Sequence, residues 1–545
     1  MKIKRILFCV TLILTVTLLI SSAALTGQSI SRYPGVTVKI MVSGAPFTSA
    51  NGIYFGPDDN LYVASAGGNE IIKMDPNSGR ILERIGPERG VSSPDDLTFG
   101  PDGSLYWTAT FNGDVGKLAP DGTHSTIVNL GPGVNPITFS PDNQWLYVAR
   151  DFFGKGLYRI NPNDGSYTVL LPDLENFNAF DFGPDNRLYG PIYGMGVIVV
   201  NVNVTPPVVE DVLDGIAPSA VKFDSQGRLI TNDNYTGEVL RCDLSTMEVE
   251  VLATLPFSMD NLAIDSRDGV YVSGDADGCI ARILPNGNHV MLSPEGMIAP
   301  NGVAVLPRPD GGDSVYVGDI FSLREFDERT GKEGSVAAAG ILSGGLATFL
   351  GALAPDGENL IITSAFSGLI QRWDPIQQQV METLFDPYMP QAAIPFGQDV
   401  VAAELLTGQV VSLTPSGRET LAQLVMPVGL ATNGTDLWVA DYALGQVFKI
   451  LPNFQPVAGG WNGPTGLAFY PPDGSLLVVE ANAGRLSKID PATGGVTILA
   501  EGLQVGYSIP MVYNGVAVAP SGTIYVTGFT PGLKTNLLYR IEIHR

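Results

Sequence analysis

The feature that most constrains the fold is a short motif that recurs along nearly the whole chain. Its first copy is NGIYFGPDDNLYV, which begins at Asn51, and related stretches are NPITFSPDNQWLYV from Asn135 and NGVAVAPSGTIYV from Asn514. Each copy has a leading polar residue, a few apolar residues, a turn of Pro, Asp or Gly, and a second apolar run. A motif that returns about every 40 residues predicts a repeat architecture. Clear copies begin at Asn51, Asp95, Asn135, Asn178, Ser219, Asp260, Asn301, Thr465 and Asn514, and degenerate copies begin near Phe349, Ile394 and Pro427.

The same series of short strands follows the motif in each repeat. In the first repeat, residues 51–55 and 61–65 read as two strands joined by a tight turn, because Asp, Asn and Gly favour turns while Tyr and Val favour strands. The runs 70–75 and 80–85 read as a third and a fourth strand. Four antiparallel strands in about 40 residues make one blade of a β-propeller. No repeat shows the apolar spacing of a helix, which excludes a helical solenoid. The 64 glycines and 40 prolines agree with many short strands and turns.

The number of repeats predicts two rings. A propeller usually has about four to eight blades, so twelve copies favour two six-bladed rings. A chain of 545 residues also exceeds what one core usually holds. We therefore predict an all-β protein with tandem β-propellers, the first at residues 25–298 and the second at 299–545. The last repeat ends at its third strand, and residues 36–42 (VTVKIMV) could supply the missing fourth strand. One ring would then contain both ends of the chain.

The first 24 residues have the plan of a secretory signal peptide. Lys2, Lys4 and Arg5 form a basic start, residues 6–20 are almost continuously apolar, and residues 21–24 are small. We predict cleavage after this segment and a secreted or periplasmic protein, with an uncleaved anchor as the alternative. No other segment indicates a membrane span. The two cysteines that remain, Cys242 and Cys279, could pair with each other or be separate buried thiols.

Charge and residue usage exclude several classes of function. Lys and Arg total 31 and Asp and Glu total 55, so the formal net charge is -24. This argues against a nucleic-acid partner, which needs a basic surface, and it favours attraction of cations. The three histidines, His124, His289 and His544, give no support for a Ser-His-Asp triad or a histidine metal site. No glycine-rich phosphate loop is present.

The leading polar residue of the motif suggests a cation site in the first ring. The first strand of a blade lines the central channel, so these positions converge on the axis. All six leading residues in the first half carry a side-chain oxygen, whereas the second half is mixed or apolar. Calcium takes about six to eight oxygen ligands, and we predict Ca²⁺ or another divalent cation here. The alternative is that these residues only form turns. The predicted metal ligands are Asn51, Asp95, Asn135, Asn178 and Asp260, and Ser219 completes the row.

Acids at the ends of the second strands are candidates for catalysis. Asp151, Asp233 and Asp275 lie there in the first half of the chain, and we predict a catalytic role for Asp233 and Asp275, because a carboxylate near a metal-bound water can act as a general base. The alternative is that they are solvated loop acids. Aromatic residues in the same loops could line a pocket or pack between blades. They are Phe111, Phe152, Phe153, Tyr193 and Tyr235.

The repeats at residues 135–165 and 260–287 resemble the six-bladed propellers of the gluconolactonase, senescence-marker-protein and luciferin-regenerating-enzyme family. They also resemble NHL-repeat and strictosidine-synthase-like proteins. The first resemblance implies a divalent cation, often calcium, held by one Glu, two Asn and one Asp. Asn135, Asn178 and Asp260 match the family's Asn and Asp ligands, but position 51 is Asn where the family has Glu. The resemblance implies a metal-dependent lactonase-like hydrolase acting on a small molecule. A non-catalytic NHL-like propeller with a protein partner and a strictosidine-synthase-like enzyme are the alternatives.

Overall fold

The chain forms two compact units, each made almost entirely of β-strands. We call the unit Ala45–Gly296 the first ring, and the unit formed by the residues up to Gly44 and from Met297 onward the second ring. Among the described residues, no helix is long and apolar enough to cross a membrane. The predicted signal peptide at residues 1–24 lies outside the described residues. The computed structural model describes residues 30–308, 311–339, 345–385, 387–414, 417–507, 511–530 and 535–544.

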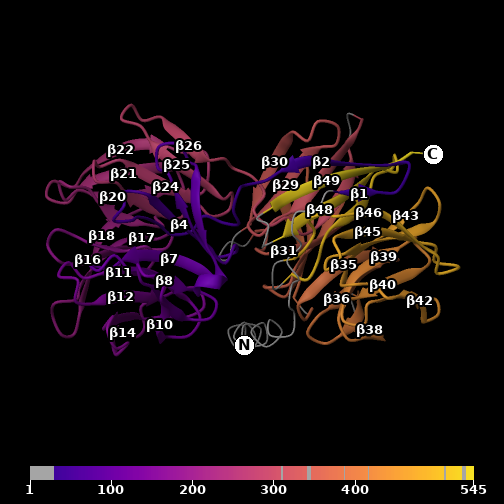
Figure 1. Cartoon of the computed structure of the whole chain (residues 1–545), viewed down its shortest axis with the longest axis horizontal. Helices are drawn as coiled ribbons and strands as arrows, with labels where there is room; N and C mark the ends of the chain where they lie inside the picture. Colours follow the sequence, from indigo (N-terminus) through magenta and orange to yellow (C-terminus); the bar gives the residue numbers. More distant parts are fainter. Residues whose placement is uncertain are drawn as a thin grey trace. The chain divides into compact units, whose positions relative to one another are not determined.

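The first ring contains six antiparallel sheets of four strands, each built from strands consecutive in the chain, and these are blades 1 to 6 (Figure 1). A short 3-10 helix, η1 (Pro87–Arg89), follows blade 1. The blades contain, in order, β3 (Ile53–Phe55), β4 (Leu61–Ser65), β5 (Glu70–Met74) and β6 (Ile81–Ile85); β7 (Pro94–Phe99), β8 (Leu105–Ala109), β9 (Asp114–Leu118) and β10 (His124–Asn129); β11 (Val134–Phe139), β12 (Leu146–Arg150), β13 (Leu157–Ile160) and β14 (Tyr167–Leu171); β15 (Asp181–Phe182), β16 (Leu188–Ile192), β17 (Gly196–Asn201) and β18 (Val208–Asp214); β19 (Val221–Phe223), β20 (Leu229–Asp233), β21 (Glu238–Asp243) and β22 (Glu248–Thr254); β23 (Leu262–Ile264), β24 (Val270–Gly274), β25 (Cys279–Ile283) and β26 (His289–Ser293).

The second ring also contains six sheets, which are blades 7 to 12. The prediction of tandem β-propellers with twelve blades is therefore confirmed. The blades contain, in order, β27 (Val303–Pro307), β28 (Asp313–Gly318), β29 (Ser322–Asp327) and β30 (Glu333–Ala338); β31 (Leu350–Asp356), β32 (Asn359–Ser364), β33 (Leu369–Asp374) and β34 (Gln379–Leu384); β35 (Pro390–Phe396), β36 (Asp399–Glu404), β37 (Gln409–Thr414) and β38 (Gly417–Gln423); β39 (Pro427–Thr432), β40 (Leu437–Asp441), β41 (Gln446–Leu451) and β42 (Gln455–Gly459); β43 (Pro464–Tyr470), β44 (Ser475–Glu480), β45 (Arg485–Ile489), β46 (Val496–Glu501) and the edge strand β1 (Ser31–Arg32); β47 (Val516–Val518), β48 (Ile524–Thr530), β49 (Thr535–Ile543) and β2 (Val36–Ser43).

Strand β2 closes the second ring. It pairs antiparallel with β49 from Val36 opposite Ile543 to Ser43 opposite Leu537, and the indigo strand lies beside the yellow one in Figure 1. The structure thus differs from the contiguous division at residues 25–298 and 299–545, because residues 30–44 belong with the second ring. The physical reason is the unpaired edge that β49 would otherwise present, since its repeat supplies no fourth strand of its own.

Aromatic pairs join neighbouring blades of the first ring. The last residue of an inner strand is usually Phe, and its ring meets edge-on the Tyr at the second position of the preceding blade's second strand. Such edge-to-face pairs add stability beyond the area that they bury. Their ring centroids are 4.9 Å apart in Phe55–Tyr271 and Phe99–Tyr62, 5.1 Å in Phe182–Tyr147, 5.2 Å in Phe139–Tyr106, and 5.3 Å in Phe223–Tyr189.

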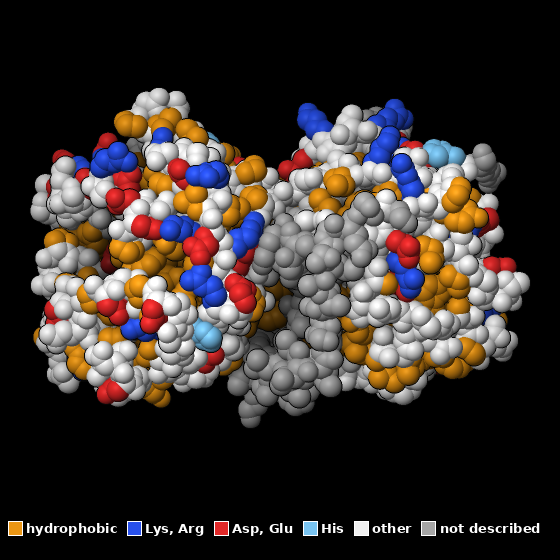
Figure 2. All heavy atoms as spheres, in the orientation of Figure 1, with side chains coloured by type: hydrophobic (Ala, Val, Ile, Leu, Met, Phe, Trp, Pro, Cys, Tyr) orange, Lys and Arg blue, Asp and Glu red, His pale blue; other side chains and the backbone are white. Residues whose placement is uncertain are grey.

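The Asp of the motif's turn has a structural role in several blades. Asp58 pairs with Lys73 on β5 at 2.5 Å, and Asp473 pairs with Lys488 on β45 at 2.7 Å. On the face shown in Figure 2, acidic and basic side chains of the first ring likewise lie beside one another. These exposed pairs each contribute about 0–1 kcal/mol. Cys242 and Cys279 are both free and buried, so the two-thiol alternative holds.

Removing β1 and β2 should destabilise the second ring alone. A chain that begins at Ala45 keeps all six blades of the first ring but exposes the edge of β49. We expect one of the two unfolding transitions in differential scanning calorimetry to fall by at least about 5 °C while the other stays unchanged. A chain that begins at Ile30 is the matched control. Identical thermograms for the two chains would contradict this role of β2.

Candidate functional site

A recurring main-chain hydrogen bond determines which side chains reach the mouth of each channel. In blade 3 the N–H of Asp151, the residue after β12, donates to the carbonyl of Gly133 at 2.8 Å. The acceptor lies two residues before the leading residue Asn135. The same bond joins Tyr193 to Asn176 in blade 4. It places the residue after the second strand beside the start of the first strand. We call the leading residues the anchor row and the residues after the second strands the mouth row. In the first ring the anchor row is Asn51, Asp95, Asn135, Asn178, Ser219 and Asp260, and the mouth row is Ala66, Thr110, Asp151, Tyr193, Asn234 and Asp275.

The same bond corrects the alignment of the second ring. It joins Leu405 to Met389 and Tyr442 to Met426, so the leading residues there are Gln391 and Val428. The sequence analysis placed them at Ile394 and Pro427, and Gly351 replaces Phe349 by strand register. None of Gly351, Gln391 and Val428 is an Asn or Asp, so the residue type that marks most other copies of the motif is missing there. The anchor row is then Asn301, Gly351, Gln391, Val428, Thr465 and Asn514, and the mouth row is Ile320, Ala365, Leu405, Tyr442, Ala481 and Phe529.

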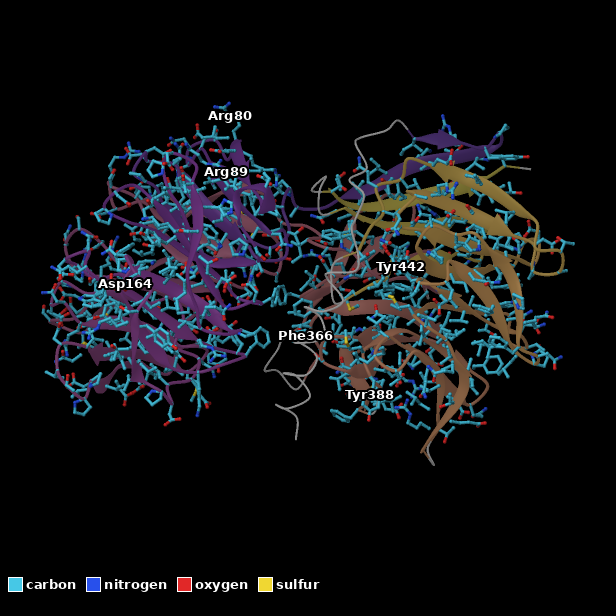
Figure 3. All side chains as sticks on the ribbon, turned by 60° about the horizontal axis from the view of Figure 1, so that its bottom comes forward. Arg80, Arg89, Asp164, Phe366, Tyr388 and Tyr442 are labelled. Carbon is cyan, nitrogen blue, oxygen red and sulfur yellow. The ribbon has the colours of Figure 1, made fainter. Side chains whose placement is uncertain are left out.

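Four carboxyl groups gather at the mouth of the first ring, from Asp95, Asp151, Asp260 and Asp275. Burial is the main cause that raises the pKa of each, to about 7 for Asp95, to about 6 for Asp275, and well above the usual range for the other two. Repulsion between carboxylates adds to it, since Asp275 and Asp95 both raise the pKa of Asp260. No cation is among the leading influences on these four groups. Exposed Asp164, at the outer edge in Figure 3, behaves in the opposite way, because hydrogen bonds from Ser166 lower its pKa.

Asp151 is the least satisfied of the four acids. Its side chain has no exposed surface, and among the described residues neither carboxylate oxygen is paired in a hydrogen bond of good geometry. The Asn135 side chain is close enough to favour the charged form, but burial and the neighbouring Asp95 outweigh it. A buried polar group without a partner costs about 1–3 kcal/mol. A ligand that supplies positive charge would therefore stabilise the Asp151 carboxylate.

Aromatic residues surround this acidic mouth. The pKa of Tyr193 is raised by burial and then by Asp275, Asp260 and Asp151, which places its ring beside the acids. Phe152 meets Tyr193 edge-on at 5.4 Å, and Phe111 lies 6.3 Å from Phe153. The structure thus brings four of the five predicted pocket aromatics into paired contacts around the mouth. Tyr235 is 78% exposed and pairs with none of them.

Not every anchor residue is free to bind a ligand. The side-chain oxygen of Asn51 accepts hydrogen bonds from the Ser49 hydroxyl at 2.7 Å and from the Ala66 N–H at 3.2 Å. The Ser219 hydroxyl donates to the carbonyl of Met259 at 2.9 Å. These two residues hold loops in place, as the turn-forming alternative expects. The Asp95 carboxylate is in contact with the Thr110 hydroxyl, and the Asn135 side chain is in contact with Asp151. The Asn178 oxygen accepts only the N–H of the next residue.

The two predicted catalytic acids occupy different positions. Asp233 is the last residue of β20, and its carboxylate accepts hydrogen bonds from the N–H groups of Ala217 and Tyr235, each at 2.9 Å. In the second ring, Asp441 holds its own entry loop in the same way, through Val425 and Met426. Asp233 therefore has a structural role in its blade. Asp275 lies one position further along, in the mouth row, and belongs with the axial acids.

A second polar layer lies deeper in the first ring, and the sequence analysis missed it. Asp96 accepts hydrogen bonds from the Ile137 N–H at 3.1 Å and the Asn261 amide at 3.4 Å. Lys222, almost fully buried, has its Nζ 3.8 Å from Asp181 and 5.5 Å from the centre of the Tyr54 ring. Asp181 and Asp96 both raise the pKa of Lys222. Charged residues inside otherwise apolar first strands were the signal that could have revealed this layer.

The axis of the second ring is filled by its own chain. The segment Met511–Tyr513, which we call the plug, is buried between β46 and β47. The Val512 N–H donates to the Gln391 side chain at 2.7 Å, and Met511 lies against Gly351. The Tyr507 hydroxyl is 3.0 Å from that of Tyr442, which is labelled in Figure 3. Blade 12 thus sends a segment across the axis to the anchor residues of blades 8 and 9.

Among the described residues, no group of three or more His, Cys, Asp and Glu side chains is arranged to hold a metal ion. The four axial acids influence one another electrostatically without converging on one point. Any cation at the mouth would therefore need amide or water oxygens in addition to carboxylates.

Comparison with known proteins adds little beyond the fold. No family model and no curated protein matches the sequence. Two solved structures of the extracellular domain of BT4673 from B. thetaiotaomicron, described as a one-component and a hybrid two-component system, each share 12% identity with this chain at a TM-score of 0.33. The alignments cover 91% and 90% of this chain and 76% of the other. Likeness at this level supports no statement about function, and the lactonase and NHL resemblance stays a prediction.

Replacing Asp151 by Asn should stabilise the protein when divalent cations are absent. The amide has the same shape, carries no charge, and can donate as well as accept hydrogen bonds. We expect the free energy of unfolding of the first ring to rise by about 1–3 kcal/mol in chelator at pH 8. Asp173→Asn, at a site that is 83% exposed, is the control. A loss of stability in Asp151→Asn would show that the carboxylate is satisfied in the native state.

The cation-free first ring should lose stability as the pH rises from about 5 to 8. The pKa values of Asp95 (about 7) and of Asp96 and Asp275 (about 6) exceed the unfolded value of about 3.9. The folded state therefore binds more protons in this window, and stability falls as these groups ionise. Urea unfolding in chelator at the two pH values measures the change. A free energy of unfolding that increases with pH over this range would contradict it.

Loss of the hydrogen bond to the plug should lower the stability of the second ring alone. Gln391→Leu removes the acceptor of the buried Val512 N–H, which should cost about 1–3 kcal/mol. Thermal unfolding should show a lower transition for the second ring only. Gln377→Leu, in an exposed turn of blade 8, is the control. Equal stability of the two variants would mean that the bond is dispensable.

Proposed function

We propose that the first ring is a cation-binding β-propeller domain and that calcium is the divalent cation it suits best. The observation that carries this proposal is Asp151, which is fully buried, has no hydrogen bond of good geometry at either oxygen among the described residues, and lies among three further carboxyl groups. A buried charge without a partner is costly, and a bound cation removes that cost. The long-range field of a chain with net charge -24 also attracts cations.

The residues present fit a hard cation in their chemistry. Asp95, Asp151 and Asp260 would supply carboxylate oxygens, and Asn135 and Asn178 would supply neutral amide oxygens. Calcium accepts such mixtures together with water, at about six to eight ligands. Asn51 is the weakest of the predicted ligands, because Ser49 and Ala66 already bind its oxygen. If the predicted signal peptide directs export, the dissociation constant would lie at about 10⁻⁴–10⁻³ M, the range of extracellular calcium modules.

Calorimetric titration of the full chain with calcium tests this proposal. We expect binding by the wild type at pH 8, and a loss of affinity of at least about tenfold in Asp151→Asn and Asp260→Asn, since affinity follows ligand charge. Asp173→Asn should bind like the wild type. Calcium should also raise the unfolding temperature of the first ring and leave the second unchanged. Absence of both the heat and the thermal shift in the wild type would refute a calcium site.

Hydrolysis of a small ester or lactone is a second candidate function. Its support is the position of Asp275, which lies among the axial acids and close to Tyr193. A carboxylate placed beside a cation can accept a proton from water. Turnover of a panel of lactones should then require calcium and fall by at least about 100-fold in Asp275→Ala. Calcium binding without any turnover would instead favour a binding or scaffold domain with a structural ion.

A further inference from the structure

The first ring has a second opening, at the far end of its channel from the acidic mouth. A cavity of about 460 Å³ lies where the inner strands β3, β7, β11, β15 and β19 end and enter their turns. The anchor row stands at the starts of the same strands, so the two openings lie at opposite ends of the axis. The volume falls within the range of about 300–1,000 Å³ that is usual for small-molecule sites.

The floor of this cavity carries an unbalanced negative charge. Asp181 lines the floor with 29% of its side chain exposed, while Lys222 behind it is only 7% exposed. Lys222 is shared with Asp96 in the layer above, so one ammonium faces two carboxylates. The 3.8 Å separation between Lys222 and Asp181 is too long for a strong ionic hydrogen bond. The remaining acid of the wall, Asp224, is already neutralised by Arg228 at 2.8 Å.

The walls of the cavity are aromatic. Five aromatic rings line it above Asp181, and four of them are the inner-strand phenylalanines that pack edge-on against tyrosines of neighbouring blades. This packing holds their orientation, so the walls are preformed. Aromatic rings around a carboxylate attract organic cations for two reasons. The ring faces carry partial negative charge, and the carboxylate neutralises the charge of the cation after the cation has lost its water. The five rings are those of Tyr54, Phe99, Phe139, Phe182 and Phe223.

We propose that this cavity is a binding site for a small organic cation, of the alkylammonium or quaternary-ammonium class. The charge of the floor disfavours an anion, and an uncharged ligand would leave the partly exposed Asp181 offset only by Lys222 at 3.8 Å and by the Phe182 N–H. A metal ion would find a single carboxylate not already held by an arginine, whereas hard cations need several oxygens. A compact ammonium ligand satisfies the carboxylate and the aromatic walls together. This site is independent of the calcium proposal, because it shares no side chain with the acidic mouth.

Titration of the full chain with choline, followed by ligand-observed NMR, tests the proposal. The neutral isostere of choline, with carbon in place of the quaternary nitrogen, is the matched ligand. We expect choline to bind at least about tenfold more tightly than the isostere. Asp181→Asn should reduce choline affinity by about tenfold, and Phe182→Leu should weaken it without disturbing the floor. Asp164→Asn, an exposed turn acid of blade 3, is the control variant.

The outcomes separate this site from the acidic mouth. Choline binding should persist in saturating calcium and in Asp151→Asn. Competition by calcium, or loss of choline binding in Asp151→Asn with retention in Asp181→Asn, would move the ligand to the mouth and overturn the proposal. Equal affinity for choline and its isostere would also overturn it, since the charge would then have no role. Unfolding temperatures equal to that of the wild type establish that each variant is folded.

Discussion

A main-chain bond from the residue after the second strand to the carbonyl two residues before the leading residue recurs in blades 2 to 5 and 9 to 11 and organises both rings. It is formed by Asp151 with Gly133 in the first ring and by Tyr442 with Met426 in the second. Because a shift of one residue turns every side chain to the opposite face of a strand, this bond decides which residues face the axis and which hold loops. Asp275 and Asp233 show the consequence. They occupy neighbouring positions at the ends of equivalent strands, yet one joins the axial acids and the other accepts loop N–H groups.

The two polar layers of the first ring differ in whether the protein itself supplies a cation to offset the buried carboxylates. In the deeper layer, Lys222 offsets Asp96 and Asp181, and main-chain and amide N–H groups complete the satisfaction of Asp96. In the outer layer no described cation offsets Asp95, Asp151, Asp260 or Asp275. The same fold therefore builds one layer in which an internal cation offsets part of the negative charge, and one that depends on solvent, protons or a ligand. Uncompensated buried charge of this kind is common at functional sites, where it lowers the stability of the free protein and favours the binding of a ligand.

The sequence predicted the fold well because its determinants are local. Strand and turn residues recur in each repeat, and the leading positions of blades 1 to 6 follow the same spacing, so all six were aligned correctly. In blades 8 to 10 the leading positions are Gly351, Gln391 and Val428, which lack the Asn or Asp that marks most other copies of the motif. The placement of β2 beside β49 joins residues about 500 positions apart, and the sequence indicated it only as an option, through a last repeat that lacks a fourth strand and a spare apolar run at residues 36–42. The importance of Asp151 was also hidden, since its lack of a partner is a property of packing and not of spacing.

The two rings are built from the same kind of blade, but the axis of the second ring is filled and that of the first is open. In the second ring the anchor and mouth rows are largely apolar or amide, and the plug fills the space between them with Met511 and Val512. No free carboxylate is needed there, because Gln391 pairs with a main-chain N–H of the same chain. In the first ring the connection from β22 to Asp260 is only five residues, 255–259, against twelve, 502–513, from β46 to Asn514. That short connection leaves no segment to cross the axis, so the channel keeps its acidic mouth at one end and its aromatic cavity at the other. Loop length at one blade junction, rather than the blade fold itself, thus separates a ring that is closed by its own chain from a ring that is open to ligands.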